Sequence, residues 1–193
     1  SGGSGVNMNS FALKVDSTTV ASSAYTKTVI TNGVKVTYTP AALADGSHTI
    51  TVNCSDNDGN AANTATSTFI VDTVPPTLNL TAPQEGATLN SSIVTVTGTT
   101  NDATSSTVTV KITVNGTDQG SVTVATNGSF SREVTLAEGS NSIVVTATDA
   151  AGKASVVSRT VNLDTSAPVI QSASVSPNPV NTGATMIITV VIE

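Results

Sequence analysis

The side chains best suited to binding a ligand lie in one oxygen-rich stretch, SDNDGNA at residues 55–61. Asp56, Asn57 and Asp58 offer carboxylate and amide oxygens on a short loop, which are the ligands that calcium prefers. The stretch lacks the twelve-residue spacing and terminal Glu of an EF-hand, so that motif is excluded. The alternative interpretation is a solvated turn, in which Gly59 adopts a positive φ and the acidic side chains cap their own backbone.

No group of residues is typical of catalysis. His48 is the only histidine, and no Ser or Cys stands at a spacing that would pair it with this base. The single cysteine, Cys54, is in phase with Ile50 and Val52, a pattern typical of a small buried residue rather than a reactive thiol. We therefore expect no enzymatic activity and no cofactor, with calcium at residues 55–61 as the one alternative.

Five Asn-x-Ser/Thr sequons occur, at Asn53, Asn79, Asn90, Asn115 and Asn127. Asn90, Asn115 and Asn127 fall at expected turns or strand ends, which suits a glycan. Asn53 lies within an expected strand and is the least suited. We predict glycosylation at Asn79, Asn90, Asn115 and Asn127. The alternative is that a Ser/Thr-rich chain generates such triplets by chance.

The composition argues against several classes of partner. Lys and Arg number 7 against 13 Asp and Glu, and the net charge is -6, so no basic patch is available for nucleic-acid phosphates. No apolar run approaches the roughly 18 residues of a membrane span, and we expect no membrane insertion. Trp is absent and Tyr occurs twice, which leaves few aromatic rings to stack on sugars.

An internal repeat determines the organisation of the chain. LADGSHTITVNCSDNDGNA at 43–61 aligns with LAEGSNSIVVTATDAAGKA at 136–154 at an offset of 93 residues. VDTVPPTL at 71–78 aligns with LDTSAPVI at 163–170 at an offset of 92. This period indicates two copies of one module, of the size of a small β-sandwich.

Short strands separated by turns fill the second copy. Period-two alternation or β-branched enrichment covers 92–99, 107–116, 120–126, 129–136, 141–148 and 155–163. Gly, Asn and Asp turn signals lie between these stretches, and no helical period is present. The pattern predicts an all-β fold of tandem immunoglobulin-like (Ig-like) β-sandwiches. The residues expected in the core are Val108, Val110, Ile112, Phe130, Val134, Ile143, Val145 and Ala147.

Both copies resemble a known family of repeats. ADGSHTITV with DNDGN, and AEGSNSIVVTATDAAGK, are each followed by a DTxxP linker, and in this they are similar to bacterial and archaeal Ig-like repeat domains of large cell-surface proteins. The resemblance covers nearly the whole chain. It implies the Ig-like fold and an extracellular or cell-surface location, while repeats of this kind serve as stalks, adhesins, wall-layer parts and enzyme accessories alike.

The predicted module boundaries do not coincide with the ends of the sequence. Residues 77–164 predict a complete module, which a linker at 73–76 joins to residues 1–72. Residues 1–72 correspond to strands C to G only, so their strands A and B are missing. Residues 165–193 repeat the opening of the complete module and predict strands A and B of a third module.

Three explanations account for this order. In the first, the chain is a window of a longer array of Ig-like repeats; in the second, it is a subunit that lends strands A and B to the next copy. In the third, the two ends pair within one molecule, but the LDTSAP linker is too short to fold back along a complete module. The first two leave an apolar groove to be covered on the first module. The groove residues expected are Val34, Val36, Tyr38, Ile50 and Val52. The core residues of the first module are expected to become buried only when strands A and B are supplied; they are Leu13, Val15, Ile50, Val52 and Cys54.

The stretch TGATMIITVVIE at residues 182–193 supplies a suitable strand. Its alternation predicts a donor strand that buries Met186, Ile188, Val190 and Ile192 in the groove of a neighbouring copy. Such a strand, left free, is an aggregation-prone edge. Joining of this kind does not close on itself, so the expected partner is the protein itself, in a head-to-tail polymer.

The same geometry brings the oxygen-rich loop to a joint between modules. In an Ig sandwich the F–G loop lies at the pole where strand A begins, so Asp164 of a donor is expected near residues 56–58 of its acceptor. Calcium would clamp this junction. Within one chain, the equivalent contact is between Asp72 and Asp149. Lys153 is expected there as a salt-bridge partner, so a metal site in the second copy is expected to be weaker than one at residues 56–58.

We therefore predict a structural subunit or segment of an extracellular Ig-like filament, stalk or adhesin, joined head to tail by donor-strand complementation. The alternative is a fragment of a longer monomeric surface adhesin, or a carbohydrate-binding accessory module. The state of assembly separates the two, because the first polymerises and the second stays monomeric.

Overall fold

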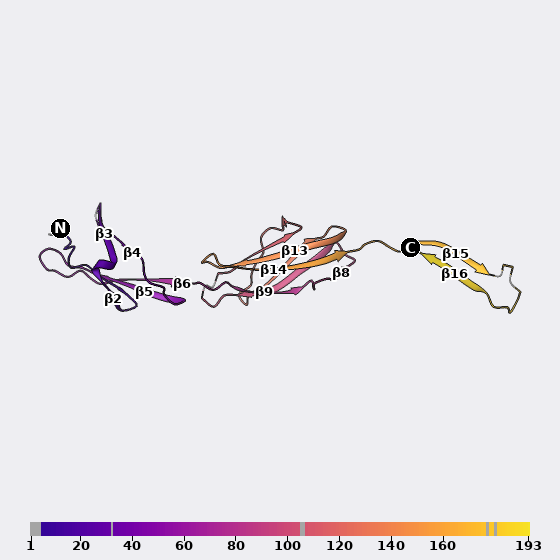
Figure 1. Ribbon diagram of the computed structural model, residues 1–193, viewed down its shortest axis with the longest axis horizontal. Helices are drawn as coiled ribbons and strands as arrows, with labels where there is room; N and C mark the ends of the chain where they lie inside the picture. The colour runs from indigo at the N-terminus through magenta and orange to yellow at the C-terminus, as the bar shows by residue number, and fades with distance from the viewer. Residues whose placement is uncertain (1–4, 32, 105–106, 177, 180) are drawn as a thin grey trace.

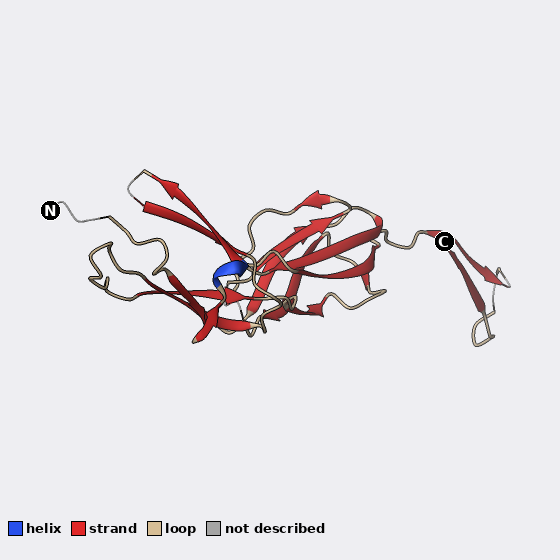
Figure 2. Cartoon of the chain, turned by 60° about the vertical axis from the view of Figure 1, so that its left-hand side comes forward, coloured by secondary structure: helices blue, strands red, loops and turns tan. Residues whose placement is uncertain are grey.

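The computed structural model describes residues 5–31, 33–104, 107–176, 178–179 and 181–193. Three units follow one another along its longest axis (Figure 1): strands β1 to β6, strands β7 to β14, and a hairpin of β15 and β16. The helix in the described part of the chain is one 3-10 turn, η1 (Ser22–Ala24), blue in Figure 2. No described helix is long and apolar enough to span a membrane. The predicted all-β class is confirmed.

The second module is a sandwich of two sheets. The larger has the strand order β11-β10-β13-β14-β8 and the smaller the order β12-β9-β7. The larger sheet contains β8 (Thr88–Leu89), β10 (Thr109–Val114), β11 (Thr117–Asp118), β13 (Gly139–Thr148) and β14 (Ala154–Leu163). The smaller sheet contains β7 (Thr77–Ala82), β9 (Ile93–Asn101) and β12 (Ser129–Thr135).

Alternate residues of these strands build one core between the two sheets. Of the eight residues expected there, seven are buried and Val108 is partly buried against them. Each fully buried Val or Ile side chain stabilises the fold by roughly 1.5–3 kcal/mol. The core therefore depends on both sheets, since Val96 of β9 and Ile143 of β13 are each 0% exposed.

The first module has a counterpart of the larger sheet, with the order β2-β1-β5-β6, and a separate pair of strands, β3 and β4. These strands are β1 (Ala12–Val15), β2 (Thr18–Val20), β3 (Tyr25–Ile30), β4 (Gly33–Tyr38), β5 (Gly46–Asn53) and β6 (Ala65–Val71). Strand β4 precedes β5 as β12 precedes β13, so it takes the place of β12. In the described part of residues 1–72, no strand takes the places of β9 and β7.

The C-terminal unit is a bare hairpin. Strand β15 (Ile170–Ser176) pairs antiparallel with β16 (Ile187–Ile192), and every residue of both strands is exposed. Among the described residues these two strands form a sheet of their own. A two-stranded hairpin of this kind is at best marginally stable alone in water, because it has nothing to pack against.

Candidate functional site

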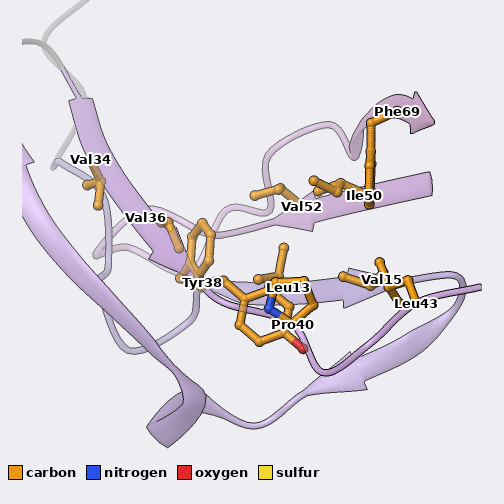
Figure 3. Close-up of a pocket in the computed structure, with 11 residues that line it drawn as sticks. Leu13, Val15, Val34, Val36, Tyr38, Pro40, Leu43, Ile50, Val52 and Phe69 are labelled. Carbon is orange, nitrogen blue, oxygen red and sulfur yellow. The ribbon is translucent and has the colours of Figure 1, made fainter. Parts of the chain in front are cut away.

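An apolar groove of about 500 Å³ opens on the first module (Figure 3). It is lined by Phe11, Leu13, Val15, Val34, Val36, Tyr38, Pro40, Leu43, Ile50, Val52 and Phe69. The lining includes all five residues that the sequence placed on the uncovered face. Because none of the lining residues is charged, the groove favours an apolar occupant over water.

Strand alternation positions these side chains. Leu13 of β1 lies opposite Val52 of β5, and Val15 lies opposite Ile50, so all four point to the same face of the sheet. Strand β4 supplies the other wall through every second residue. The groove is therefore the space between two sheets that a complete sandwich would fill.

One expectation about this groove is wrong. Leu13 and Val15 were expected to become buried only when strands A and B are supplied, yet they are 4% and 9% exposed already. Pro40 and Leu43, from the loop between β4 and β5, line the same groove and shelter its floor. Ile50, Val52 and Cys54 are only half-buried, as expected of an open sandwich.

The second module shows what fills the equivalent space. Strand β9 pairs with β12 over seven residue pairs, from Thr99 with Ser129 to Ile93 with Thr135. Strand β7 pairs with the other edge of β9. Val96 and Leu80 from these two strands belong to the core. A complete sandwich thus needs an antiparallel pair of strands beside β12, and by homology beside β4.

The hairpin carries a continuous apolar face. The cross-strand pairs on it are Val175 with Ile188, Ala173 with Val190, and Ile170 with Ile192. Residues directly opposite in an antiparallel pair point to the same side. The predicted donor residues of β16 therefore share their face with apolar residues of β15, and Met186 precedes them in phase. The large hydrophobic residues of this face are 44–65% exposed.

The predicted calcium loop is held by its own hydrogen bonds. The Asp56 Oδ1 atom accepts from the backbone N–H groups of Asp58 at 3.0 Å and Asn60 at 2.8 Å, and Oδ2 accepts from Asn60 Nδ2 at 2.9 Å. The Asn60 side chain, followed by backbone N–H donors, lowers the pKa of Asp56. Asn57 and Asp58 are exposed on this loop. This geometry is that of a capped turn.

Asp164 lies at the far end of the second module, where it is exposed and accepts a hydrogen bond from the Ser166 N–H at 3.0 Å. Its meeting with residues 56–58 of another copy stays a prediction. Within the chain, Asp72 and Asp149 lie together as expected. Lys153 is exposed and bonds Asp149 through its backbone, since its N–H donates to Asp149 Oδ1 at 2.8 Å and its carbonyl accepts from the Asp149 N–H at 3.0 Å. The expected salt bridge from its side chain is not among the described ones.

Sequence reasoning missed Asp102, which joins Asp72 and Asp149. This third carboxylate comes from the loop after β9, and the relative strength of a metal site in the second copy stays a prediction. Only the Asn-Asp pair at 101–102, just after an apolar strand, signalled it.

The four predicted glycan sites, Asn79, Asn90, Asn115 and Asn127, are all exposed. At Asn115 the side chain is engaged at both ends: Nδ2 donates to Asn141 Oδ1 at 2.9 Å, and Oδ1 accepts from the Ser142 N–H at 2.8 Å. A glycan on that nitrogen would leave it a single N–H with which to make the bond to Asn141. The glycan sites stay predictions.

Comparison with known families agrees with this architecture. Residues 4–73 match the family described as bacterial Ig-like domain, and residues 76–165 match the family described as glucodextranase, domain B. The expected resemblance to bacterial Ig-like domains is confirmed, and residues 4–73 carry the match to that family. No curated protein matches the chain.

Three solved structures are similar to the chain. The fibronectin(III)-like modules of Clostridium thermocellum CbhA share 20% identity, with a TM-score of 0.48, over 82% of this chain and 80% of theirs. A 1.5-MDa bacterial ice-binding adhesin shares 24% identity, with a TM-score of 0.43, over 86% of this chain and 56% of its own. A chimeric titin Z1Z2 tandem shares 14% identity, with a TM-score of 0.38, over 82% and 86%.

Proposed function

We propose that the protein is a structural component of an extracellular Ig-like filament, stalk or adhesin. In this assembly the β15–β16 hairpin of one copy completes the open first module of the next. The observation that carries the proposal is the complementarity of the groove and the hairpin. Among the described residues, the groove has no counterparts of β9 and β7, and the hairpin, which corresponds to that part of the second module, joins no other sheet.

The second module suggests how the two parts dock. There β9 pairs with β12, and β4 takes the place of β12 in the first module. Strand β16 of the donor therefore pairs with the free edge of β4, and β15 lies outside it. The resulting sheet has the order β3-β4-β16-β15, with Ile188 and Val190 facing β1 and β5.

Burial of the hairpin's apolar face supplies the driving force. Ile188, Val190 and Ile192 are 46–63% exposed, and each stabilises the complex by up to about 1.5–3 kcal/mol when it becomes buried. Docking also gives this marginally stable hairpin a sheet to pack against, and part of the burial energy offsets the entropy of ordering it. Donor and acceptor surfaces lie on opposite units of the chain, so the contact is heterologous and propagates as a fibre.

The same pairing operates when the hairpin and the groove belong to adjacent modules of one longer polypeptide. In both cases the present chain carries a donor and an acceptor, so it is expected to self-associate when purified. Mass spectrometry of native material, which determines where the subunit begins and ends, distinguishes a polymer of separate subunits from an array within one chain.

The test is the assembly state of the full chain, measured by light scattering and negative-stain imaging over a range of concentrations. Wild type is expected to form linear polymers. Ile188→Asp places a charge on the docking face and is expected to give monomers with an unchanged second module.

Thr189→Asp is the matched control, because it puts the same charge on the opposite face of the same strand. It is expected to polymerise. Polymers of Ile188→Asp, or monomers of wild type at high concentration, would overturn the proposal.

The match of residues 76–165 to glucodextranase domain B favours a second candidate, an accessory module of a carbohydrate-active protein. That role predicts a monomer that binds glucans. Affinity electrophoresis on immobilised glucans, with Ile188→Asp as the monomeric sample, measures this binding separately from assembly.

A further inference from the structure

Three carboxylates converge at the joint between the first and second modules. Asp72 directly follows β6, Asp102 follows β9, and Asp149 follows β13. One oxygen atom from each lies within 4.8 Å of the other two. The ends of three strands, one from the first module and two from the second, thus place their carboxylates close together.

Two of these carboxylates are buried with an oxygen that has no partner. Asp72 is 9% exposed and Asp149 is 6% exposed, and Oδ2 of each accepts no hydrogen bond within the described structure. Their Oδ1 atoms are used locally, accepting from the N–H groups of Val74 at 3.2 Å and Lys153 at 2.8 Å. These turns hold the two side chains in place through Oδ1 and leave each Oδ2 without a protein donor.

A buried carboxylate without a partner is unfavourable, and neighbouring like charges add repulsion. Neither described salt bridge of the chain lies at this joint: they join His48 to Asp16 and Lys111 to Asp118. A cation bound between the oxygens would remove both penalties. The burial and the missing partners therefore point to an ion.

The spacing fits calcium. Calcium binds carboxylate oxygens at about 2.3–2.6 Å, so two ligands on opposite sides of the ion are about 4.6–5.2 Å apart. Magnesium demands a nearly ideal octahedron at shorter distances and usually keeps several waters. Three carboxylates on separate loops suit the larger and more tolerant ion.

We propose that Asp72, Asp102 and Asp149 form a calcium site that locks the joint between the two modules. The linker already has one anchor on the first module, because the Thr73 N–H and Oγ1 donate to Asp45 at 2.8 and 2.9 Å. Asp72, the adjacent residue, would tie the linker to the second module through the ion. This site does not depend on donor-strand assembly.

The test is calcium binding to the full chain with Ile188→Asp as the background, so that assembly does not contribute. After removal of metal by chelation, titration calorimetry with calcium chloride is expected to show a bound ion, with weaker binding of magnesium chloride. Asp149→Asn is expected to lower calcium affinity by about tenfold or more, because affinity follows the number of charged ligands. Glu133→Gln, an exposed position on β12 in the same module, removes the same charge and is expected to change nothing.

Thermal unfolding gives a second test, because the shift in the unfolding midpoint is expected to have opposite signs in chelator and in calcium. In chelator, Asp149→Asn is expected to raise the midpoint of the second module, because it relieves repulsion and keeps the Oδ1 acceptor. In calcium, it is expected to lower the midpoint relative to the parent, and Asp102→Asn is expected to behave alike. No calcium binding by the parent, or a lowered midpoint in both conditions for both variants, would show that the cluster is only structural.

Discussion

The first and second modules present the same strand positions with different coverage. Ile143 on β13 is 0% exposed, whereas Ile50, 93 residues earlier on β5, is only half-buried. Both face an equivalent neighbour, Val114 on β10 or Val15 on β1. The difference is the pair β7 and β9, which has no counterpart in the described part of the first module. A repeat can therefore encode one half of a core and leave the strands that close it to another segment.

The two modules also stabilise one turn with different chemistry. In the second, Asn141 is 1% exposed, and its Nδ2 donates to the Ala137 carbonyl at 2.7 Å. In the first, the equivalent residue is His48, whose Nε2 lies 2.7 Å from the Ala44 carbonyl. Asn115 partners Asn141, while Asp16 partners His48. One pair is neutral and the other titrates, so the modules should differ in their response to pH.

The largest expected difference between the two modules concerns the equivalent core residues Ile143 and Ile50. Ile143→Ala is expected to destabilise the second module by about 2–5 kcal/mol, because it leaves a closed cavity. Ile50→Ala is expected to cost clearly less in a monomeric chain, where the side chain already faces an open groove. Denaturant unfolding measures both: tyrosine fluorescence reports the first module, which holds Tyr25 and Tyr38, and circular dichroism reports the whole chain.

Assembly sharpens this comparison. In polymers the cost of Ile50→Ala should rise toward that of Ile143→Ala, because docking closes the groove. Equal costs in the monomer would mean that the first module is already complete, contrary to the open groove.

The next effect in size is at the buried amide. Asn141→Ala is expected to destabilise the second module by about 1–3 kcal/mol, since it leaves buried backbone groups of the turn unsatisfied. The lost bonds are those of Asn141 with Asn115, the Ala137 N–H, the Ala137 carbonyl and the Gly139 carbonyl. Asn127→Ala is the matched control, because it makes the same substitution at an exposed turn residue. A loss no larger than that of the control would show that water satisfies the turn.

Much of this architecture is predictable from sequence because it depends on local periodicity. Alternation along β4 and β5 was enough to predict that Val36 and Ile50 face the groove, since each strand carries this property in its own residues. The meeting of Asp72 with Asp149 was predicted from the internal repeat together with the topology of an Ig sandwich.

Features set by loops were not predictable. Asp102 reaches the joint because the chain turns after β9, and no repeat in the first module indicates where that loop goes. Leu13 and Val15 are sheltered by the loop containing Pro40 and Leu43, whose path also depends on tertiary packing. The hydrogen-bonded pairs at the turns join residues about 26–32 positions apart, a separation that no local pattern encodes.

The smallest expected effect is the dependence of the first module on pH. Asp16 Oδ2 lies 2.5 Å from His48 Nδ1, and this hydrogen bond, with that to the Ala44 carbonyl, raises the pKa of His48 above its ordinary value of 6.5. The bond to His48, followed by that from the Thr49 N–H, lowers the pKa of Asp16 below 3.8. Both ring nitrogens face oxygen atoms, so only the protonated ring can donate to both.

The sign of the effect follows from these directions. The contribution of His48 is fully present below pH 6.5 and is lost as the pH rises through its raised folded-state pKa. The contribution of Asp16 is present above pH 3.8 and is lost as the pH falls through its lowered folded-state pKa. Thermal unfolding followed by tyrosine fluorescence should therefore show a maximum for the first module between these two values, with a decline on the alkaline side. The double change Asp16→Asn with His48→Asn installs the neutral pair of the second module and should flatten the profile. A wild-type profile as flat as that of the double variant would mean that the pair contributes nothing to folding, and that the two modules differ in coverage alone.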